Sequence, residues 1–314
     1  MGAGMSAILE ARGVTRSFGP IKVLHGVDFS LIPGEVHALI GENGAGKSTT
    51  MKILGGYLSP TEGALLLDGQ PVTFADQRQA EDAGILMIHQ EFNLALQLTV
   101  EENIFLGREK RRGPFLDQKA MQAEARDLLA RLDCHVDPRT PIRDLSVPNR
   151  QMVEIARALG RKARVLIMDE PTAVLTGRET DVLLEQIARL KAQGAAILYS
   201  SHKLDEIARI ADRVTVLRDG AHIVTRAAEG FSEHAMAEAM VGRDLTDLYP
   251  PASPAQDDVV LEVEGLTVPG RVRDASFTLR RGEVLGFAGL VGAGRTELME
   301  GIAGLRPATG RGAG

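Results

Sequence analysis

Residues 41–48, GENGAGKS, constrain the possible fold more than any other part of the chain. The apolar run EVHALI precedes them and predicts a short strand, and an apolar pattern at helical spacing follows. Glycines at the first, fourth and sixth positions let the backbone curl so that its N–H groups point at phosphate oxygens. The pattern G-x-x-x-x-G-K-S between a strand and a helix predicts a phosphate-binding loop, and the alternative is a chance glycine-rich turn.

Two side chains of this loop have direct roles in such a site. Lys47 is expected to reach the β- and γ-phosphates, and the Ser48 hydroxyl to ligate Mg²⁺. The sequence therefore predicts a phosphate-bearing nucleotide and Mg²⁺ as ligands. The nucleotide-binding residues expected in the loop are Gly41, Glu42, Asn43, Gly44, Ala45, Gly46, Lys47, Ser48 and Thr49.

Two further apolar runs end in residues that suit phosphate chemistry. RVLIMDEP predicts a buried strand that ends at Asp169 and Glu170, and such strand ends lie where α/β sheets bind ligands. Asp169 is expected to hold the Mg²⁺ shell, and Glu170 to polarise the attacking water as general base. Two capping acids are the alternative. The run AAILYSSH ends at His202, which can touch the γ-phosphate and this water, although a lone histidine is more often structural.

The chain also contains an internal repeat. AILEARGVT (residues 7–15) resembles VVLEVEGLT (residues 259–267), and residues 31–48 resemble residues 279–296. The segment between the copies, YPPASPAQDD, is polar and rich in proline, as expected of a linker. We therefore expect a complete first copy in residues 1–248, a linker in residues 249–258 and an incomplete second copy in residues 259–314.

Charge and composition narrow the classes of function. The net charge of −6 gives no general attraction for nucleic acid, so we expect no nucleic-acid partner. The single cysteine, Cys134, excludes an intramolecular disulfide and fits a reducing compartment. No apolar run approaches the roughly 18 residues of a membrane helix, and Glu10 and Arg12 come too early for a signal peptide. We expect a cytoplasmic protein that can dock on a membrane protein.

Five motifs in a fixed order carry a resemblance to a known family. They are GENGAGKST, IHQEFNL with Gln90, LSVPNRQMVEIARAL, VLIMDEPT and SSHKLDEI with His202. With these motifs the chain resembles the ATP-binding subunit of ABC transporters. QEFNL, QMVEIARAL, TAVLT and GLVGAGRTE make it more similar to the tandem-cassette ATPase of bacterial monosaccharide importers of the ribose, galactose and xylose class.

This resemblance implies an α/β fold and a transport function. The expected fold is a P-loop NTPase of the ABC type: a mixed or parallel core sheet flanked by helices, with an N-terminal antiparallel β part, a helical subdomain and an incomplete second copy. The expected activity is ATP hydrolysis that energises carbohydrate import. The implied partners are membrane-spanning permease subunits, through them a periplasmic or extracellular sugar-binding protein, and a second cassette or homodimer partner. The implied location is the inner face of the cell membrane.

The resemblance also implies roles for two further residues. Phe18 would stack on adenine, with an ordinary core phenylalanine as the alternative. Gln90 would ligate Mg²⁺ and begin the loop that senses the membrane partner. Residues from about 91 to 160 would form the helical subdomain that touches that partner.

The signature motif of this family, ideally LSGGQ, is altered in the chain. It binds the γ-phosphate of ATP held by the opposing cassette, and here the residues that follow Leu145 are Ser146, Val147, Pro148 and Asn149. Ser146 is a plausible N-cap and Pro148 suits a first helical turn, but proline lacks the N–H that this position would offer to phosphate. The loss of one preorganised donor costs about 10²–10³ in rate, so we expect a weak signature.

The second phosphate loop is altered too. Its residues are Gly289, Gly292, Gly294, Arg295 and Thr296, with arginine where the first copy has Lys47. A planar guanidinium does not replace an ammonium, so we expect no hydrolysis at this loop. The chain has no second signature to serve the first loop, which suggests a truncated or frame-disrupted product. Residues 259–314 are too few to cover both faces of a sheet, so we expect them to be partly disordered or to lean on the first copy.

Two other functions compete with the importer. One is a soluble ABC ATPase of translation or repair, which would carry a long basic or helical insertion between its cassettes. The other is a nucleotide-binding relic that occupies a permease without turnover.

Overall fold

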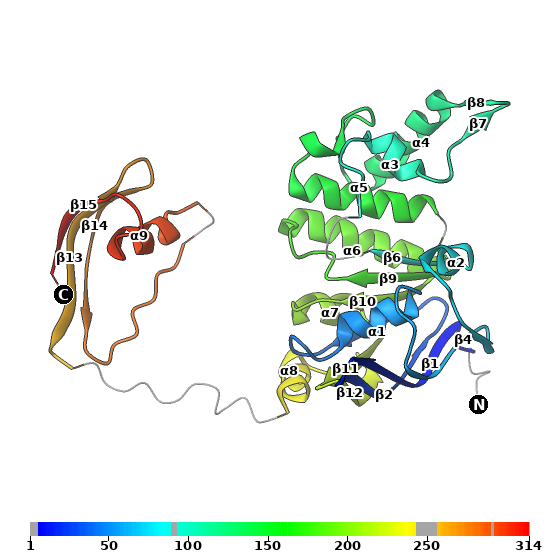
Figure 1. Cartoon of the computed structure of the whole chain (residues 1–314), viewed down its shortest axis with the longest axis horizontal. Coiled ribbons are helices and arrows are strands. Elements are labelled where there is room, and N and C mark those ends of the chain that lie inside the picture. The colour runs from blue at the N-terminus through cyan, green and yellow to red at the C-terminus, as the bar shows by residue number, and fades with distance from the viewer. Residues whose placement is uncertain (1–5, 89–92, 162, 243–255, 290–291, 314) are drawn as a thin grey trace. The chain divides into compact units, whose positions relative to one another are not determined.

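The structure, a computed structural model, describes residues 6–88, 93–161, 163–242, 256–289 and 292–313. The chain divides into two compact units, Met1–Leu245 and Thr246–Gly314. The first unit contains a six-stranded sheet, a four-stranded sheet and most of the helices (Figure 1). In the described part of the chain, no helix has both the length and the apolar character needed to span a membrane.

The six-stranded sheet of the first unit has the order β12-β11-β3-β10-β9-β6. Its strands are β3 (Val36–Ile40), β6 (Ile85–Ile88), β9 (Val165–Asp169), β10 (Ala196–Ser200), β11 (Arg213–Arg218) and β12 (Ala221–Ala227). All neighbouring pairs are parallel except β11 with β12. Because β3, β9 and β10 are buried along their whole length, their sequences read as continuous apolar runs.

Two hydrophobic cores lie on the opposite faces of this sheet. In β3, Val36, Ala38 and Ile40 belong to one core and Leu39 to the other, because successive side chains of a strand point to opposite faces. The first core includes residues of α3 (Val100–Phe105), α4 (Gln118–Arg131), α5 (Val147–Gly160), α6 (Gly177–Ala192), α7 (Leu204–Ile210) and α8 (Glu233–Val241). The second includes residues of α1 (Lys47–Leu54), α2 (Gln77–Asp82) and the four-stranded sheet.

The four-stranded sheet is antiparallel. It has the order β2-β1-β4-β5 and is built from β1 (Leu9–Phe18), β2 (Ile21–Leu31), β4 (Glu62–Leu67) and β5 (Gln70–Val72). Asp68 and Gly69 join β4 to β5, and Asp219 and Gly220 join β11 to β12. All four turn residues have positive φ, as a two-residue hairpin of type I′ requires, so the Asp-Gly pairs act as hairpin turns.

Helices dominate the part of the first unit between β6 and β9. In Figure 1, α3, α4 and α5 lie together at the end of the unit opposite to the antiparallel sheet. The same part contains a small hairpin, β7 (Arg111–Arg112) and β8 (Phe115–Leu116), and a short 3₁₀ helix, Ile142–Asp144. Together, the mixed sheet, the antiparallel sheet and the helical part confirm the fold class that the sequence predicts.

The second unit repeats the beginning of the first. Its sheet has the order β14-β13-β15, which matches β2-β1-β4, and consists of β13 (Val259–Val268), β14 (Val272–Arg280) and β15 (Thr309–Ala313). Helix α9 (Arg295–Ile302) corresponds to α1 and has the same length of eight residues. The repeat read in the sequence is therefore also a repeat of structure.

The counterpart of β3 differs between the two units. Val284 corresponds to Val36, but 97% of its surface is exposed whereas Val36 is 1% exposed, and residues 284–289 form no strand. In the first unit β3 pairs with β10 and β11, and the described residues of the second unit contain no equivalent of either strand. A strand that lacks partners on both edges has no ladder to join, which explains the difference.

The two corresponding valines provide a test of this difference. We predict that Val36→Ala lowers the free energy of unfolding of the first unit by about 2–3 kcal/mol, because it removes buried methyl groups and leaves a cavity. Val284→Ala should change stability by no more than about 0.5 kcal/mol. Urea unfolding of both variants measures the two values, and equal losses would contradict the structure.

Candidate functional site

The loop of residues 41–48 requires glycine at positions where the backbone approaches other parts of the fold closely. A Cβ at Gly41 would lie 2.3 Å from the carbonyl oxygen of Leu217, which is backbone and cannot move aside. Gly46 has φ of 95°, and a Cβ there would lie 2.5 Å from the buried side chain of Leu24. The glycines thus hold the loop against β2 and the end of β11 while it turns into α1.

Lys47 lies inside this loop at the first position of α1. It is only 6% exposed, and its ammonium donates hydrogen bonds to the carbonyl oxygens of Gly41 (2.7 Å) and Glu42 (3.1 Å). Burial lowers the pKa of Lys47, while the charges of Glu170 and Asp169 oppose this effect. The loop therefore presents a buried cation at a helix N-terminus, which is an arrangement that attracts phosphate.

The predicted acids lie at the carboxyl end of β9, next to the end of β10. Asp169 pairs in register with Ser200, and the Ser200 hydroxyl donates to Oδ1 of Asp169 at 2.8 Å. The same hydroxyl accepts a hydrogen bond from the backbone N–H of Glu170 at 3.1 Å. Ser200 thus links the two acids to the neighbouring strand.

Glu170 and His202 meet in the structure. Oε1 of Glu170 lies 2.7 Å from Nε2 of His202. Glu170 has a φ of +50°, which is unusual for a residue with a Cβ and costs about 1–3 kcal/mol. Such a conformation persists only when the surrounding structure enforces it, so the backbone of Glu170 is held by its neighbours and not by local preference.

The donor set of this site suits a hard divalent cation. Ser48 lies in the first turn of α1, and Asp169 is nearly buried at the end of β9. Among the described residues, no group of three or more histidine, cysteine, aspartate or glutamate side chains could hold a metal ion. Mg²⁺ needs few protein ligands because it keeps waters and takes phosphate oxygens, so one hydroxyl and one carboxylate fit it.

Phe18 and Gln90 are the other two residues for which a ligand contact is predicted. Phe18 ends β1 and is 45% exposed, with the guanidinium of Arg16 stacked 4.7 Å above its ring. Phe18 is therefore not part of the hydrophobic core, and its stacking on adenine stays a prediction. Gln90 belongs to residues 89–92, outside the described part of the chain.

The altered signature forms the start of α5. Ser146 occupies the N-cap position, but its side chain makes no capping hydrogen bond, so the expectation of a serine cap holds for the position only. Pro148 lies in the first turn, where its missing N–H leaves the helix itself intact. Val147 is 45% exposed. One backbone N–H donor is thus missing from the surface formed by Ser146, Val147, Pro148 and Asn149.

The family assignment follows from comparison with known proteins. Residues 24–173, which include the loop and both acids, match the family model of the ABC transporter. The first unit is an ABC-type ATP-binding cassette. Crystal structures with the same fold include an ATP-binding subunit of an ABC transporter, with 27% identity and a TM-score of 0.62 over 77% of this chain and 98% of that one. Another is the ADP conformation of an ATP-binding cassette, with 25% identity and a TM-score of 0.64 over 78% and 98% of the two chains.

Curated relatives confirm the resemblance to the sugar class. One is the ribose import ATP-binding protein RbsA 1 of Rubrobacter xylanophilus, 51% identical over 97% of this chain and 61% of the relative. Another is a putative ribose/galactose/methyl galactoside import ATP-binding protein of Burkholderia cenocepacia, 53% identical over 95% of this chain and 58% of the relative. A third is the galactose/methyl galactoside import ATP-binding protein MglA 1 of Photobacterium profundum, at 47% over 95% and 61%. The chain thus spans about three fifths of the length of these relatives.

The second unit reproduces the loop of the cassette but not its surroundings. Gly292 and Gly294 have φ of 85° and 86°, close to the 84° and 95° of Gly44 and Gly46. Arg295 begins α9 as Lys47 begins α1, yet Arg295 and Thr296 are exposed, and so is Gly289. The local turn is therefore repeated without the burial that surrounds Lys47.

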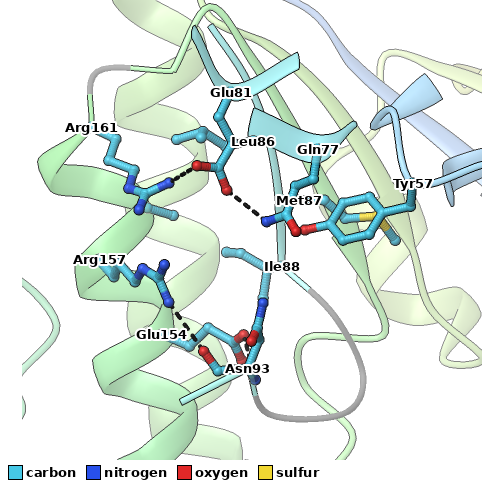
Figure 2. Close-up of a pocket in the computed structure, with 11 residues that line it drawn as sticks. Tyr57, Gln77, Glu81, Leu86, Met87, Ile88, Asn93, Glu154, Arg157 and Arg161 are labelled. Atoms are coloured by element: carbon cyan, nitrogen blue, oxygen red, sulfur yellow. Dashed lines mark hydrogen bonds and ion pairs between the residues drawn. The ribbon is translucent and has the colours of Figure 1, made fainter. Parts of the chain in front are cut away.

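A small pocket lined by both polar and apolar side chains lies between α2, β6 and α5 of the cassette (Figure 2). Its volume of about 30 Å³ is comparable to the space of one water molecule, and no residue of the loop lines it, so it does not hold a nucleotide. Figure 2 shows Glu154 and Arg157 of α5 reaching the backbone of Asn93. Glu154 accepts from the Asn93 N–H at 3.2 Å, and Arg157 donates to the Asn93 carbonyl at 3.1 Å.

The carboxyl group of Glu154 is held in an unusual environment. The residue is 6% exposed, and its Oε2 atom has no hydrogen-bond partner among the described residues. Burial raises the pKa of Glu154 to about 7, although the Asn93 N–H and the charge of Arg157 oppose the rise. Glu154 therefore changes its charge near neutral pH inside the cassette.

Sequence reasoning missed several residues that shape the site. Ser200, which links both acids, was hidden within the apolar run of β10, although two serines before a histidine at a strand end are a usable signal. Glu154 and Glu206 resemble surface acids in the sequence, because nothing in a helical pattern shows that a charged position is 94% or 99% buried. Only the tertiary packing reveals them.

The pKa of Glu154 predicts how stability depends on pH. Because the pKa rises from its ordinary 4.5 to about 7 on folding, the group favours the folded state fully below pH 4.5 and loses this contribution as pH rises through 7. The difference in unfolding free energy between the native chain and Glu154→Gln should fall by roughly 3 kcal/mol between pH 4.5 and 8. Urea unfolding across this range measures it. The exposed Glu185→Gln is the control, and a difference that does not change with pH would contradict the prediction.

Proposed function

We propose that this chain binds Mg·ATP at the loop of residues 41–49 and hydrolyses it to energise carbohydrate import through an ABC transporter. The observation that carries the proposal is the meeting of three strand ends at one edge of the sheet. There Lys47 follows β3, Asp169 ends β9 with Glu170 directly after it, and His202 follows β10. The 2.7 Å contact between Glu170 and His202 completes the group.

In this proposal each side chain has a separate role in the reaction. Lys47 and the loop N–H groups bind the β- and γ-phosphates, and Ser48, Asp169 and Gln90 would hold Mg²⁺. The ion, when bound, neutralises charge that develops on the phosphate oxygens. Glu170 accepts a proton from the attacking water as general base, and His202 orients that water and the γ-phosphate. Phe18 stacks on the adenine.

The relatives support import as the process that this hydrolysis serves. Proteins that are about half identical to this chain over the aligned residues are named as ribose or galactose import ATP-binding proteins. This favours the importer over a soluble ATPase of translation or repair. We therefore propose that the cassette docks through its helical part, with Gln90 at the sensing loop, onto membrane-spanning permease subunits that receive sugar from a binding protein. The protein would act at the inner face of the membrane.

A second cassette is part of the proposal. In the family, the γ-phosphate is bound by the signature of an opposing cassette, and Pro148 weakens the signature of this one. The loop of residues 41–49 would therefore work best against a signature from another cassette. Two copies of this chain would pair through their altered signatures and turn over slowly, at a rate per chain that rises with protein concentration.

The role of Glu170 is tested by replacing its carboxylate. We predict that Glu170→Gln lowers the rate of Mg·ATP hydrolysis by about 10²–10⁴-fold, because a general base contributes that much, and leaves Mg·ATP affinity nearly unchanged. Phosphate release and nucleotide titration measure the two quantities. The matched control, Glu185→Gln on the exposed face of α6, should retain the full rate. Binding without hydrolysis in the unaltered chain would instead support the non-catalytic relic.

The role of Lys47 is tested by binding alone. Lys47→Ala should weaken Mg·ATP binding by at least about tenfold, because it removes the buried cation that faces the phosphates. The exposed Lys22→Ala on β2 is the control and should bind as the native chain does. Titration of a fluorescent ATP analogue with Mg²⁺ gives both values. Equal affinities for all three proteins would overturn the assignment of the loop.

A further inference from the structure

Three hydroxyl groups from two separate segments converge on one carboxylate oxygen beside the site. Oε2 of Glu206, in the first turn of α7, accepts hydrogen bonds from the hydroxyls of Thr172 (2.7 Å), Tyr199 (2.8 Å) and Ser201 (2.9 Å). Lys203 forms an ion pair with the other oxygen, Oε1, at 3.0 Å. Glu206 is 1% exposed, and the three hydroxyl-bearing residues are also buried.

This carboxylate carries a negative charge in the interior. Burial raises the pKa of Glu206, but the hydrogen bonds from Thr172, Tyr199, Lys203 and Ser201 outweigh burial and hold the pKa below its ordinary value. A buried charge is costly unless hydrogen-bond donors surround it. The Glu206 carboxylate therefore holds each of these donors in place. The cluster therefore fixes the positions of its donors relative to one another.

The donors belong to the segments that carry the proposed catalytic pair. Thr172 follows Glu170 by two residues, and Ser201 immediately precedes His202. Lys203 follows His202, and its backbone N–H donates to the Ser201 hydroxyl at 3.1 Å. The unfavourable φ of Glu170 shows that this segment is held by its surroundings, and the bond from Thr172 to Glu206 is one such restraint.

We propose that Glu206 is a positioning residue that sets the distance between Glu170 and His202, and so the rate of the hydrolysis proposed above. Glu206 contacts neither member of the pair in the bonds described. It acts by joining the segment after β9 to the segment after β10. A displacement of about 1 Å in a catalytic group can lower a rate about 10²-fold, so a clamp at this point has a large effect on turnover.

The test compares Glu206→Gln with its neighbour Asp205→Asn, which removes an exposed charge from the same helical turn. Glu206→Gln keeps the shape of the side chain but removes the charge and adds an amide donor among existing donors. It should lower kcat about 10- to 100-fold and change the dissociation constant of Mg·ATP less than about twofold. Asp205→Asn should change neither. In the Glu170→Gln background, Glu206→Gln should cause little further loss of the residual rate.

A second measurement does not depend on turnover. The ring resonance of His202 in a ¹H–¹³C spectrum can be assigned because it is lost in His202→Gln. The resonance should shift in Glu206→Gln and in Glu170→Gln. Its position should not change in Asp205→Asn. If Glu206→Gln does not fold, Thr172→Val and Ser201→Ala each remove one donor and should give the same shift with smaller losses of kcat. An unchanged resonance together with an unchanged kcat would overturn the positioning role. If the native chain does not hydrolyse ATP but the His202 resonance shifts as expected, the proposed function is overturned and the positioning role is not.

Discussion

The site depends on the parallel register of β3, β10 and β9. Ile197 of β10 pairs with both Val36 of β3 and Leu166 of β9, so the three strands end at nearly the same level. Both faces of these strands are buried, and a shift by one residue would turn apolar side chains from one core to the other. Hydrophobic packing therefore fixes the register, and the register brings the loop lysine, the acids and the histidine to one edge.

The second unit shows which features of the phosphate loop depend on local sequence and which depend on the complete fold. The glycines of its loop adopt nearly the same φ angles as those of the first loop, and a helix of equal length follows. The arginine that replaces Lys47 is nevertheless exposed, and the preceding residues form no strand. Glycine spacing is thus sufficient for the turn, whereas burial of a cation requires the neighbouring strands of a complete sheet.

Much of the fold and part of the site could be predicted from the sequence. The strand–loop–helix around Lys47, the acids at the end of β9 and the Asp-Gly hairpins depend on neighbours in the chain, and local patterns show them. The strand ends indicate that Glu170 and His202 can reach the same water, whereas their direct 2.7 Å contact joins two strands and is found only in the structure. The buried environments of Glu154 and Glu206 could not be predicted, since they arise from elements distant in sequence and carry no signal in spacing or hydropathy.

Helix α5 connects the altered signature with the pocket that Asn93 lines. The helix begins at Val147, holds both backbone polar groups of Asn93 through Glu154 and Arg157, and near its end Arg161 binds Glu81 of α2 at 2.5 Å. An α-helix changes its length very little, because each turn is fixed by backbone hydrogen bonds. A movement of the chain at Asn93 that keeps these bonds must therefore displace the first turn as well. The two motifs QEFNL and QMVEIARAL are in direct contact in this chain, because Asn93 of the first is bonded to Glu154 and Arg157 of the second.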